Sequence, residues 1–481
     1  MTRGIRFPRR VFVNSTSILG GEAIARLATA SMALIVARFF GPDALGHYGY
    51  ALAVVSVLVI VPDFGLHLFT VRELSASPER IREVFWVVHW LKIGLAGAVV
   101  VFTACFAEWG IRDPERSVIF YILVGRALLQ SFSQATMAVF KAFERMHYVA
   151  FQQFVNTLVV ALWAAVALAL RADLPVLNAG FVAGQLAETG LGWIILRRIP
   201  MGAGLLRWDP RALTPLVAAC FPIGLTAILL TLNMRIDILV LGRYVPSGAL
   251  GQFSAAAWFV IATYLAASLL MTVLFPRLSR LLEGRSALRS DYVLSLLKNA
   301  LWVSAAGALL VWLSAPHLVR WVLGPDFAAA AGTLRILAPA LPLVFLNTIL
   351  FYVFVAARRQ IVCLATLGVG VAGGTLLSLY LTPRYGAAGC ALADVARELT
   401  MSVMYFCFLA RESHARLAGL ALTKIFVGAS ASLTLAALVA APPDPAAQWP
   451  AAWMVFLLAG TLLVMGFPNI RDWRLLTDDT P

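Results

Sequence analysis

Long apolar runs, separated by short connections rich in charged residues, proline and glycine, make up almost the whole sequence. A helix that crosses a membrane needs about 20 predominantly apolar residues, and the runs are of that order. Strands of a membrane barrel would instead be about ten residues long and apolar at every second position, a pattern that these runs lack. The sequence therefore predicts an all-α polytopic membrane protein with about fourteen transmembrane helices. The predicted spans are 11–37, 46–69, 84–105, 117–140, 149–170, 177–196, 213–241, 251–275, 292–314, 329–356, 361–381, 387–409, 422–441 and 450–467.

The segment that follows the first predicted helix returns, in altered form, after the seventh. Residues 38–48 (RFFGPDALGHY) and 243–253 (RYVPSGALGQF) share Arg, Ala, Leu and Gly at one offset, with aromatic residues at both flanks. Six helices separate the copies, so both copies have the same orientation, as in transporters built from parallel repeats. A chance match between short glycine-rich loops is the alternative. The repeat predicts a six-helix bundle at 1–200, a second at 201–410, and two further helices with a cytoplasmic tail at 411–481.

Composition supports a membrane protein and excludes other classes. Hydrophobic residues make up 61% of the chain and charged residues 13%, whereas soluble domains average about 25% charged. A soluble enzyme, a disulfide-rich scaffold and a disordered chain are thereby excluded. The five cysteines lie in apolar runs, form no Cys-x-x-Cys pair and have no histidine cluster beside them. We therefore expect no metal site and no cofactor.

The formal net charge of +14 has a topological explanation. Lys and Arg gather in the connections on the side of the amino terminus, and the opposite connections carry few of them. Cytoplasmic loops of membrane proteins have this excess of Lys and Arg. The bias places both termini in the cytoplasm and accounts for the charge without nucleic acid. No connection is long enough for a soluble catalytic domain, so we expect no catalytic residues.

Charged side chains inside membrane spans are costly and usually face a bundle interior or a water-filled cavity. The clearest polar stripe lies in span 117–140, where Arg126, Gln130, Ser133 and Gln134 share one helical face. No acidic residue lies on this stripe. A guanidinium beside amides suits a phosphate or a sugar, because arginine offers a planar fork to anionic oxygens. The alternative is a structural arginine bonded to carbonyl groups of a broken helix.

Two other spans carry candidate arginines. Glu22 and Arg26 are four residues apart in span 11–37 and can pair. They either form a neutral pair that only packs helices together, or they place a cation in the cavity with its carboxylate beside it. In span 213–241, Arg235 and Asp237 are two residues apart and point in nearly opposite directions. Glu188 is expected to pair with a cation from the first four spans.

Span 387–409 holds Asp394, Arg397 and Glu398 within one turn near its centre. Two acids around one arginine can be a self-satisfied structural triad. They can also be the site of a coupling proton or cation. Lys92 and Lys298 lie close enough to the inner side to extend toward the interface.

Several motifs together resemble a known family. They are residues 38–48, Asp63-Phe-Gly-Leu66, Val71-Arg-Glu-Leu74, Phe143-Glu-Arg145, Arg235-Ile-Asp237, Gly251-x-Phe-Ser-Ala-Ala256 and Tyr385-Gly-Ala-Ala-Gly389. In order and spacing they resemble the polysaccharide-transporter (Wzx-type) flippases of lipid-linked oligosaccharides. These flippases belong to the multidrug/oligosaccharidyl-lipid/polysaccharide exporter superfamily. The resemblance extends to about residue 410.

The resemblance implies two six-helix bundles with an extra pair and a V-shaped central cavity in the bacterial inner membrane. The implied activity is outward flipping of an undecaprenyl-diphosphate-linked glycan, such as an O-antigen repeat unit, with the polysaccharide assembly machinery as a further partner. The cations that the family keeps in its lumen match Arg126, Arg26 and Arg235 here.

We expect Glu22, Gln130 and Gln134 to complete this substrate site, and Asp394 and Glu398 to be candidates for the coupling ion. Two alternative functions belong to the same superfamily, a drug/cation antiporter and a peptidoglycan lipid flippase. A drug antiporter would rely on lumenal acids, whereas Arg126 has none on its stripe. A membrane glycosyltransferase or polymerase is a further alternative, against which the short outer connections argue.

Overall fold

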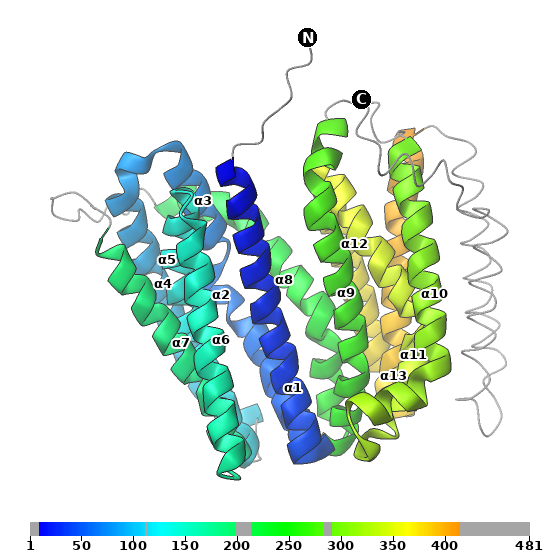
Figure 1. The fold of residues 1–481 in the computed structure, drawn as a ribbon. Helices are drawn as coiled ribbons and strands as arrows, with labels where there is room; N and C mark the ends of the chain where they lie inside the picture. The colour runs from blue at the N-terminus through cyan, green and yellow to red at the C-terminus, as the bar shows by residue number, and fades with distance from the viewer. Residues whose placement is uncertain (1–8, 111–113, 199–212, 283–290, 414–481) are drawn as a thin grey trace. The chain divides into compact units, whose positions relative to one another are not determined.

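The computed structural model describes residues 9–110, 114–198, 213–282 and 291–413, and within these it leaves out the side chains of 9–30 and of a few helix ends. The described residues are helical nearly throughout and contain no strand (Figure 1). The helices of the first half are α1 (Arg9–Leu58), α2 (Ile60–Asp63), α3 (Leu66–Ala76), α4 (Ile81–Gly110), α5 (Pro114–Ala142), α6 (Met146–Ala169) and α7 (Leu174–Leu196). Those of the second half are α8 (Leu213–Tyr244), α9 (Ser247–Leu281), α10 (Asp291–Val322), α11 (Ala330–Leu337), α12 (Ala340–Ala356) and α13 (Gln360–Ser413). Two short 3-10 turns, Pro78–Arg80 and Pro325–Phe327, connect neighbouring helices.

Among the described residues, nine helices are long and apolar enough to cross a membrane, or ten when the bent pair α11–α12 counts as one span. Ten of the first twelve predicted spans each coincide with a helix or with one arm of an interrupted helix. The other two are broken: 46–69 extends over the end of α1, α2 and the start of α3, and 329–356 extends over α11 and α12. The last two, 422–441 and 450–467, fall outside the described residues. The all-helical membrane fold is therefore confirmed, and the count of fourteen stays a prediction.

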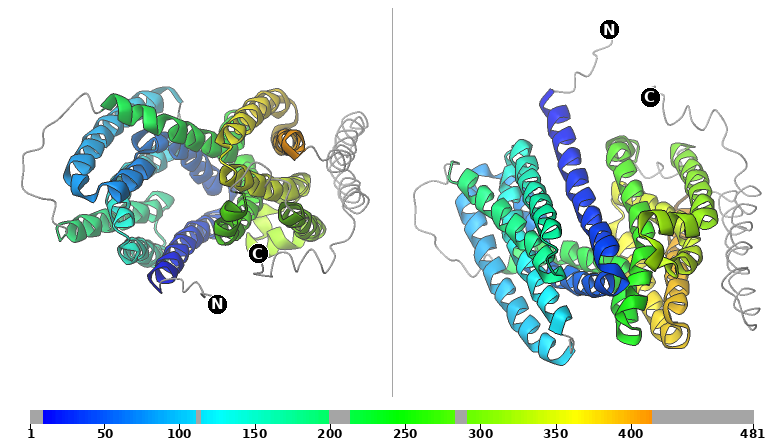
Figure 2. Two further views of the ribbon diagram at one scale, coloured as in Figure 1. Left: turned by 90° about the horizontal axis from the view of Figure 1, so that it is seen from above. Right: turned by 60° about the horizontal axis from the view of Figure 1, so that its bottom comes forward.

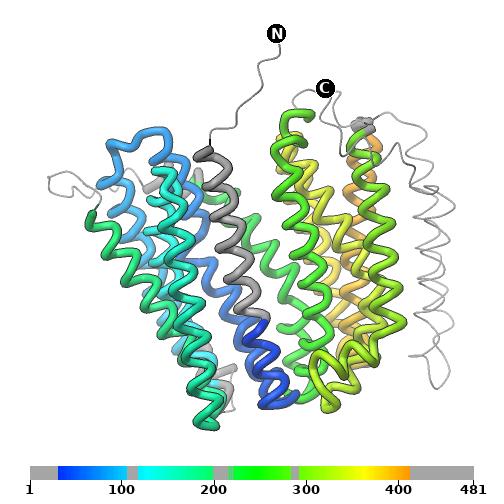
Figure 3. The backbone as a smooth tube through the Cα atoms, in the orientation of Figure 1, coloured from blue at the N-terminus to red at the C-terminus, as the bar shows by residue number. Residues whose placement is uncertain are grey.

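Glycine marks the interruptions of the two longest helices. Gly41, before Pro42 in α1, has φ 78°, and Gly386 in α13 has φ 56°. Residues other than glycine rarely adopt such positive φ angles, so each glycine allows two helical arms to meet at a bend. Figure 3 traces the bend of α1 in blue. These bends explain why α1 covers the first predicted span and the beginning of the second, and why α13 covers two predicted spans.

The chain divides into two compact units. Unit 1 comprises residues 1–40 and 47–235, and unit 2 comprises 41–46 and 236–481. In unit 1, α7 packs against α5 and α6, while α3 packs against α5 (Figures 1 and 2). In unit 2, α12 packs against α9, α10 and α13. The predicted boundaries at residues 200 and 410 stay a prediction.

Each unit has an apolar core, and apolar side chains also cover its outside. Phe85 and Phe140 lie in the core of unit 1, and Phe354 and Tyr405 stack in that of unit 2. Large apolar residues are nevertheless exposed, with Trp321 78% exposed and Ile361 77%. An apolar surface of this kind suits contact with lipid rather than with water.

The two copies of the predicted repeat contact each other within unit 2. A Cβ atom added to Gly46 would lie 2.0 Å from the carbonyl oxygen of Ser247, and one added to Gly251 would lie 1.8 Å from that of Pro42. Gly46 and Gly251 are equivalent positions of the two copies, and so are Pro42 and Ser247. The contact is therefore reciprocal, as two copies related by an approximate two-fold axis require. This close backbone approach needs glycine at both positions.

Candidate functional site

Arg126 lies on α5 in unit 1 and is partly buried. Its Cζ atom is 4.5 Å from the centre of the Phe181 ring on α7. A guanidinium over an aromatic face is attracted by the electron-rich face of the neutral ring, but this attraction does not neutralise the positive charge of the guanidinium. No described carboxylate forms an ion pair with Arg126. Its charge is thus held in a membrane helix with no described counter-ion in direct contact.

Tyr48, at the end of the first repeat motif, extends this arrangement. Its ring stacks on Phe181 with 6.4 Å between centroids and an interplanar angle of 9°. The residue is 1% exposed, and its hydroxyl has no hydrogen-bond partner among the described groups. Arg126 and Arg235 both act on this hydroxyl electrostatically. Two of the three predicted arginines therefore lie within electrostatic reach of one buried tyrosine.

Tyr48 was not predicted from the sequence as a site residue. The sequence does contain a signal for it. Tyr48 lies in a predicted membrane span, where a hydroxyl without a hydrogen-bond partner is costly and therefore suggests a polar ligand or partner.

The two glutamines of the predicted stripe, Gln130 and Gln134, follow Arg126 on α5 by about one and two turns. Both are partly buried, and within the described part of the chain neither side-chain amide forms a hydrogen bond. Their backbone carbonyls are in use, because that of Gln130 accepts from Ser133 Oγ (3.1 Å) and that of Gln134 bonds His67 Nδ1 (3.0 Å). The two amides can therefore serve a ligand.

Arg26 and Glu22 lie on α1, but their side chains are outside the described ones. Their pairing and their place in the site stay predictions.

A polar cluster between α5, α6 and α7 surrounds Glu188, which is 6% exposed. Glu188 accepts hydrogen bonds from Ser133 Oγ (3.0 Å) and from Asn156 Nδ2. Gln185 Nε2 donates to Ser133 Oγ (3.0 Å). Among the described residues no cation forms an ion pair with Glu188, because neutral donors hold its carboxylate. Its predicted pairing with a cation of the first four spans stays a prediction. Arg126 acts on Glu188 electrostatically without touching it.

Lys92 does not extend to the interface as expected. It is 0% exposed, and its Nζ atom donates to Asp63 Oδ1 (2.6 Å) and to the Ser131 carbonyl oxygen (3.0 Å). Asp63 ends α2, where Phe64 and Gly65 with positive φ interrupt the second predicted span. Burial of the lysine is tolerated because the pair satisfies both charges.

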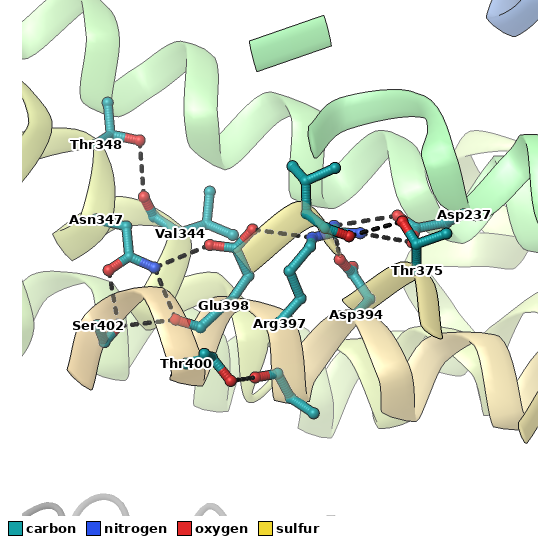
Figure 4. A network of polar contacts seen from close by, with 12 residues as sticks. Asp237, Val344, Asn347, Thr348, Thr375, Asp394, Arg397, Glu398, Thr400 and Ser402 are labelled. Atoms are coloured by element: carbon teal, nitrogen blue, oxygen red, sulfur yellow. Dashed lines mark hydrogen bonds and ion pairs between the residues drawn. The ribbon is translucent and has the colours of Figure 1, made fainter. Parts of the chain in front are cut away.

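In unit 2, Arg397 is the centre of a buried acidic cluster (Figure 4). Its Nη1 and Nη2 atoms donate to the two oxygens of Asp237 at 2.7 and 3.1 Å, and Nη2 also donates to Asp394. Its Nε atom is 3.8 Å from Glu398 Oε1. The predicted triad on α13 thus exists, and Asp237 of α8 adds a third acid that the sequence did not place there. α8 contributes Arg235 to unit 1 and Asp237 to unit 2.

Glu398 has further partners on α12 and α13. Asn347 Nδ2 donates to its Oε2 atom (2.9 Å), and Ser402 Oγ donates to Asn347 Oδ1 (2.8 Å). Each acid of the cluster is therefore bonded, which supports a structural role. The cluster holds three carboxyl groups for one guanidinium, so a bound proton is also compatible with it. Within the described part of the chain no group of three or more His, Cys, Asp or Glu is arranged to hold a metal ion.

Several solved structures similar to this chain are described as membrane transporters or flippases. A lipid II flippase MurJ in an inward closed conformation has a TM-score of 0.67 at 13% identity, covering 94% of this chain and 98% of its own. An inward-facing multidrug resistance MATE family transporter of the MOP superfamily has a TM-score of 0.66 at 13% identity, and the match covers 82% of this chain and 94% of the transporter. A MOP superfamily transporter from Pyrococcus furiosus has a TM-score of 0.58 at 13% identity, and the match covers 84% of this chain and 96% of the transporter. Its binding pocket is described as having reversed polarity. At these identities the likeness concerns the fold.

No curated protein sequence matches the chain. The family model described as polysaccharide biosynthesis protein matches residues 11–282, which is more than half of the sequence. The predicted relationship to polysaccharide transporters is thereby confirmed, and this relationship and the solved structures point to a transporter or flippase rather than an enzyme. The chain belongs to the polysaccharide biosynthesis protein family.

Proposed function

We propose that the protein is a flippase that moves an undecaprenyl-diphosphate-linked oligosaccharide from the inner to the outer leaflet of the bacterial inner membrane by alternating access. The observation that carries this proposal is Arg126, a cation within a membrane helix with no described ion-pair partner. A charge in hydrocarbon is costly unless it is paired, so the site is completed by an anion. The diphosphate is the anion that every lipid-linked oligosaccharide of this kind shares.

The groups around Arg126 suit such a head group. Arg235 adds a second guanidinium, and the unpartnered Tyr48 hydroxyl adds a neutral donor. The free amides of Gln130 and Gln134 suit sugar hydroxyls, because an amide both donates and accepts. Arginine binds two phosphate oxygens at once through its fork. We place Arg26 and Glu22 at the same site as a prediction.

A peptidoglycan lipid flippase is the second candidate, because one of the similar structures is a lipid II flippase. The family match favours a polysaccharide precursor. A drug/cation antiporter is less favoured because unit 1 presents arginines to the ligand. The acids of unit 2 are already bonded to Arg397. A membrane glycosyltransferase or polymerase is the least favoured reading, since family and fold are those of transporters. Cytoplasmic termini and the polysaccharide assembly machinery as a partner belong to the same proposal.

The test is flipping of a fluorescent lipid-linked oligosaccharide in proteoliposomes. Arg126→Ala should lower the flipping rate by at least tenfold, and Arg126→Lys should restore part of it, because lysine keeps the charge but loses the fork. The matched control is Arg335→Ala, which removes an arginine that also lies over an aromatic ring, that of Trp312 (5.6 Å), but in unit 2. Normal flipping by Arg126→Ala combined with Arg26→Ala would refute the proposed anion site.

The coupling ion is tested in the same vesicles with an imposed proton or sodium gradient. If Asp394 or Glu398 carries it, Asp394→Asn or Glu398→Gln should abolish the response to the gradient and leave binding of the lipid nearly intact. If the cluster is structural, the same variants should lower the amount of folded protein, and the molecules that do fold should still respond to the gradient.

A further inference from the structure

Glu188 is a buried carboxyl group whose direct contacts among the described side chains are all neutral. Its partners are the Ser133 hydroxyl and the Asn156 amide, and its exposed fraction is 6%. The other described acids buried to a similar degree, those around Arg397, contact a guanidinium. A carboxylate in a dry interior without a cation in contact binds a proton readily.

Ser133 has the geometry to serve Glu188 in both protonation states. Its hydroxyl has one hydrogen but two acceptors within reach, Glu188 Oε1 at 3.0 Å and the Gln130 carbonyl oxygen at 3.1 Å. With the carboxylate ionised, Ser133 donates to it. With the carboxyl group protonated, Glu188 donates to Ser133 Oγ and the serine hydrogen turns to Gln130. The hydroxyl oxygen has two lone pairs, so it also accepts from Gln185 in either state.

The remaining bonds need no rearrangement when the proton binds. Asn156 Nδ2 donates to Glu188 Oε2, which accepts in either state, and also to Gln185 Oε1 (3.2 Å). Only the hydrogen of Ser133 changes its partner. The protein can therefore load and unload a proton here without leaving a buried polar group unsatisfied.

The charge that faces Glu188 belongs to Arg126. Ser133 follows Arg126 by seven residues on α5, and Glu188 follows Phe181 by seven on α7. The contact between Arg126 and Phe181 and that between Ser133 and Glu188 therefore lie on the same faces of the two helices, about 10 Å apart along them. From α6 the groups that face Glu188 are the neutral Asn156 and Gln152, and Arg126 is the described charged group that acts on it. At an effective dielectric constant of about 20, a charge on Glu188 at this distance changes the affinity of the Arg126 site for an anion by on the order of tenfold.

We propose that Glu188 is a proton-binding site linked to the anion site at Arg126, so that a proton and the anionic head group bind together. This inference rests on the proposed function. Protonation removes the negative charge that competes for Arg126, and an anion bound at Arg126 in turn favours protonation. Loss of the proton then promotes release of the head group.

The test measures binding of an undecaprenyl-diphosphate-linked monosaccharide to the purified full chain in nanodiscs. Its diphosphate is a diester that stays ionised, so a pH dependence over about pH 5–8 reports on the protein. The wild type should bind at least about fivefold more tightly at the acidic end. Glu188→Gln mimics the protonated carboxyl group and should keep the tight affinity across the range. The control Glu83→Gln, which changes an exposed acid of unit 1, should behave as the wild type.

A second measurement uses the unaltered chain. A hydrophobic carbodiimide reacts with protonated carboxyl groups in apolar surroundings, and mass spectrometry should find Glu188 modified more as the pH falls. Unchanged pH dependence in Glu188→Gln, or no modification of Glu188 at acidic pH, would overturn the proton site. If the lipid binds equally well to wild type and Arg126→Ala, the proposed anion site itself fails, which separates the two hypotheses.

Discussion

Replacing Gly46 by alanine tests the reciprocal contact of the two repeat motifs. The new Cβ atom would lie 2.0 Å from the Ser247 carbonyl oxygen, whereas ordinary contact begins at 3.4 Å. One of the two backbones must therefore shift by about 1.4 Å, and neither side of the contact has a flexible side chain that could move instead. Overpacking of this kind costs about 1–3 kcal/mol, and a backbone carbonyl as the obstacle places Gly46→Ala at the upper end.

The assay is thermal unfolding of the purified protein in detergent, followed by its tryptophan fluorescence. Gly307→Ala is the matched control, because no atom lies within 4 Å of the added Cβ and alanine favours a helix by up to about 1 kcal/mol. Gly46→Ala should unfold at a lower temperature than the wild type, and Gly307→Ala at the same or a higher one.

Gly251→Ala should resemble Gly46→Ala, since its Cβ atom would lie 1.8 Å from the Pro42 carbonyl oxygen. The double variant should cost less than the sum of both, because the first substitution already separates the two backbones. A Gly46→Ala protein as stable as Gly307→Ala would refute the close contact.

Three further predictions follow from charge and topology. Single cysteines at 242–250 should react with an impermeant maleimide in intact cells, and those in the connection between α9 and α10 only after permeabilisation; the reverse pattern would overturn the predicted orientation. Arg397→Met should lower the free energy of unfolding by about 3–5 kcal/mol, because it leaves buried carboxylates uncompensated, and added Asp237→Asn should recover part of the loss in chemical denaturation. Lys92→Met should cost up to about 3 kcal/mol in the same assay. Added Asp63→Asn should restore stability, and its failure to do so would contradict the buried pair.

Helices were predictable from the sequence because each reflects a local property, the length of an apolar run. The run 117–140, for example, lies within α5, and 177–196 lies within α7. The break between α2 and α3 was missed because apolar residues resume at Leu66 directly after Asp63, Phe64 and Gly65, so the averaged hydropathy remains that of one span.

The site was predictable only as far as it depends on one helix. The stripe of Arg126, Gln130 and Gln134 is a matter of spacing along α5. The partners that these residues meet come from other helices, as Phe181 does. Arg397 and Asp237 are 160 residues apart, and no single-helix pattern indicates that they pair.

The reciprocal contact at Gly46 and Gly251 has a consequence for the ancestry of the chain. The predicted six spans per repeat would return the chain to the side on which it started, so two separate half-length proteins would insert in the same orientation. Such halves could form this contact as an isologous dimer, with every residue present twice. In a single fused chain the two sides are free to diverge, and position 43 shows this. Asp43 corresponds to Gly248, and a Cβ atom on Gly248 would lie 3.1 Å from Asp43 Oδ1. Each side has become adapted to the other, which a symmetric dimer could not do.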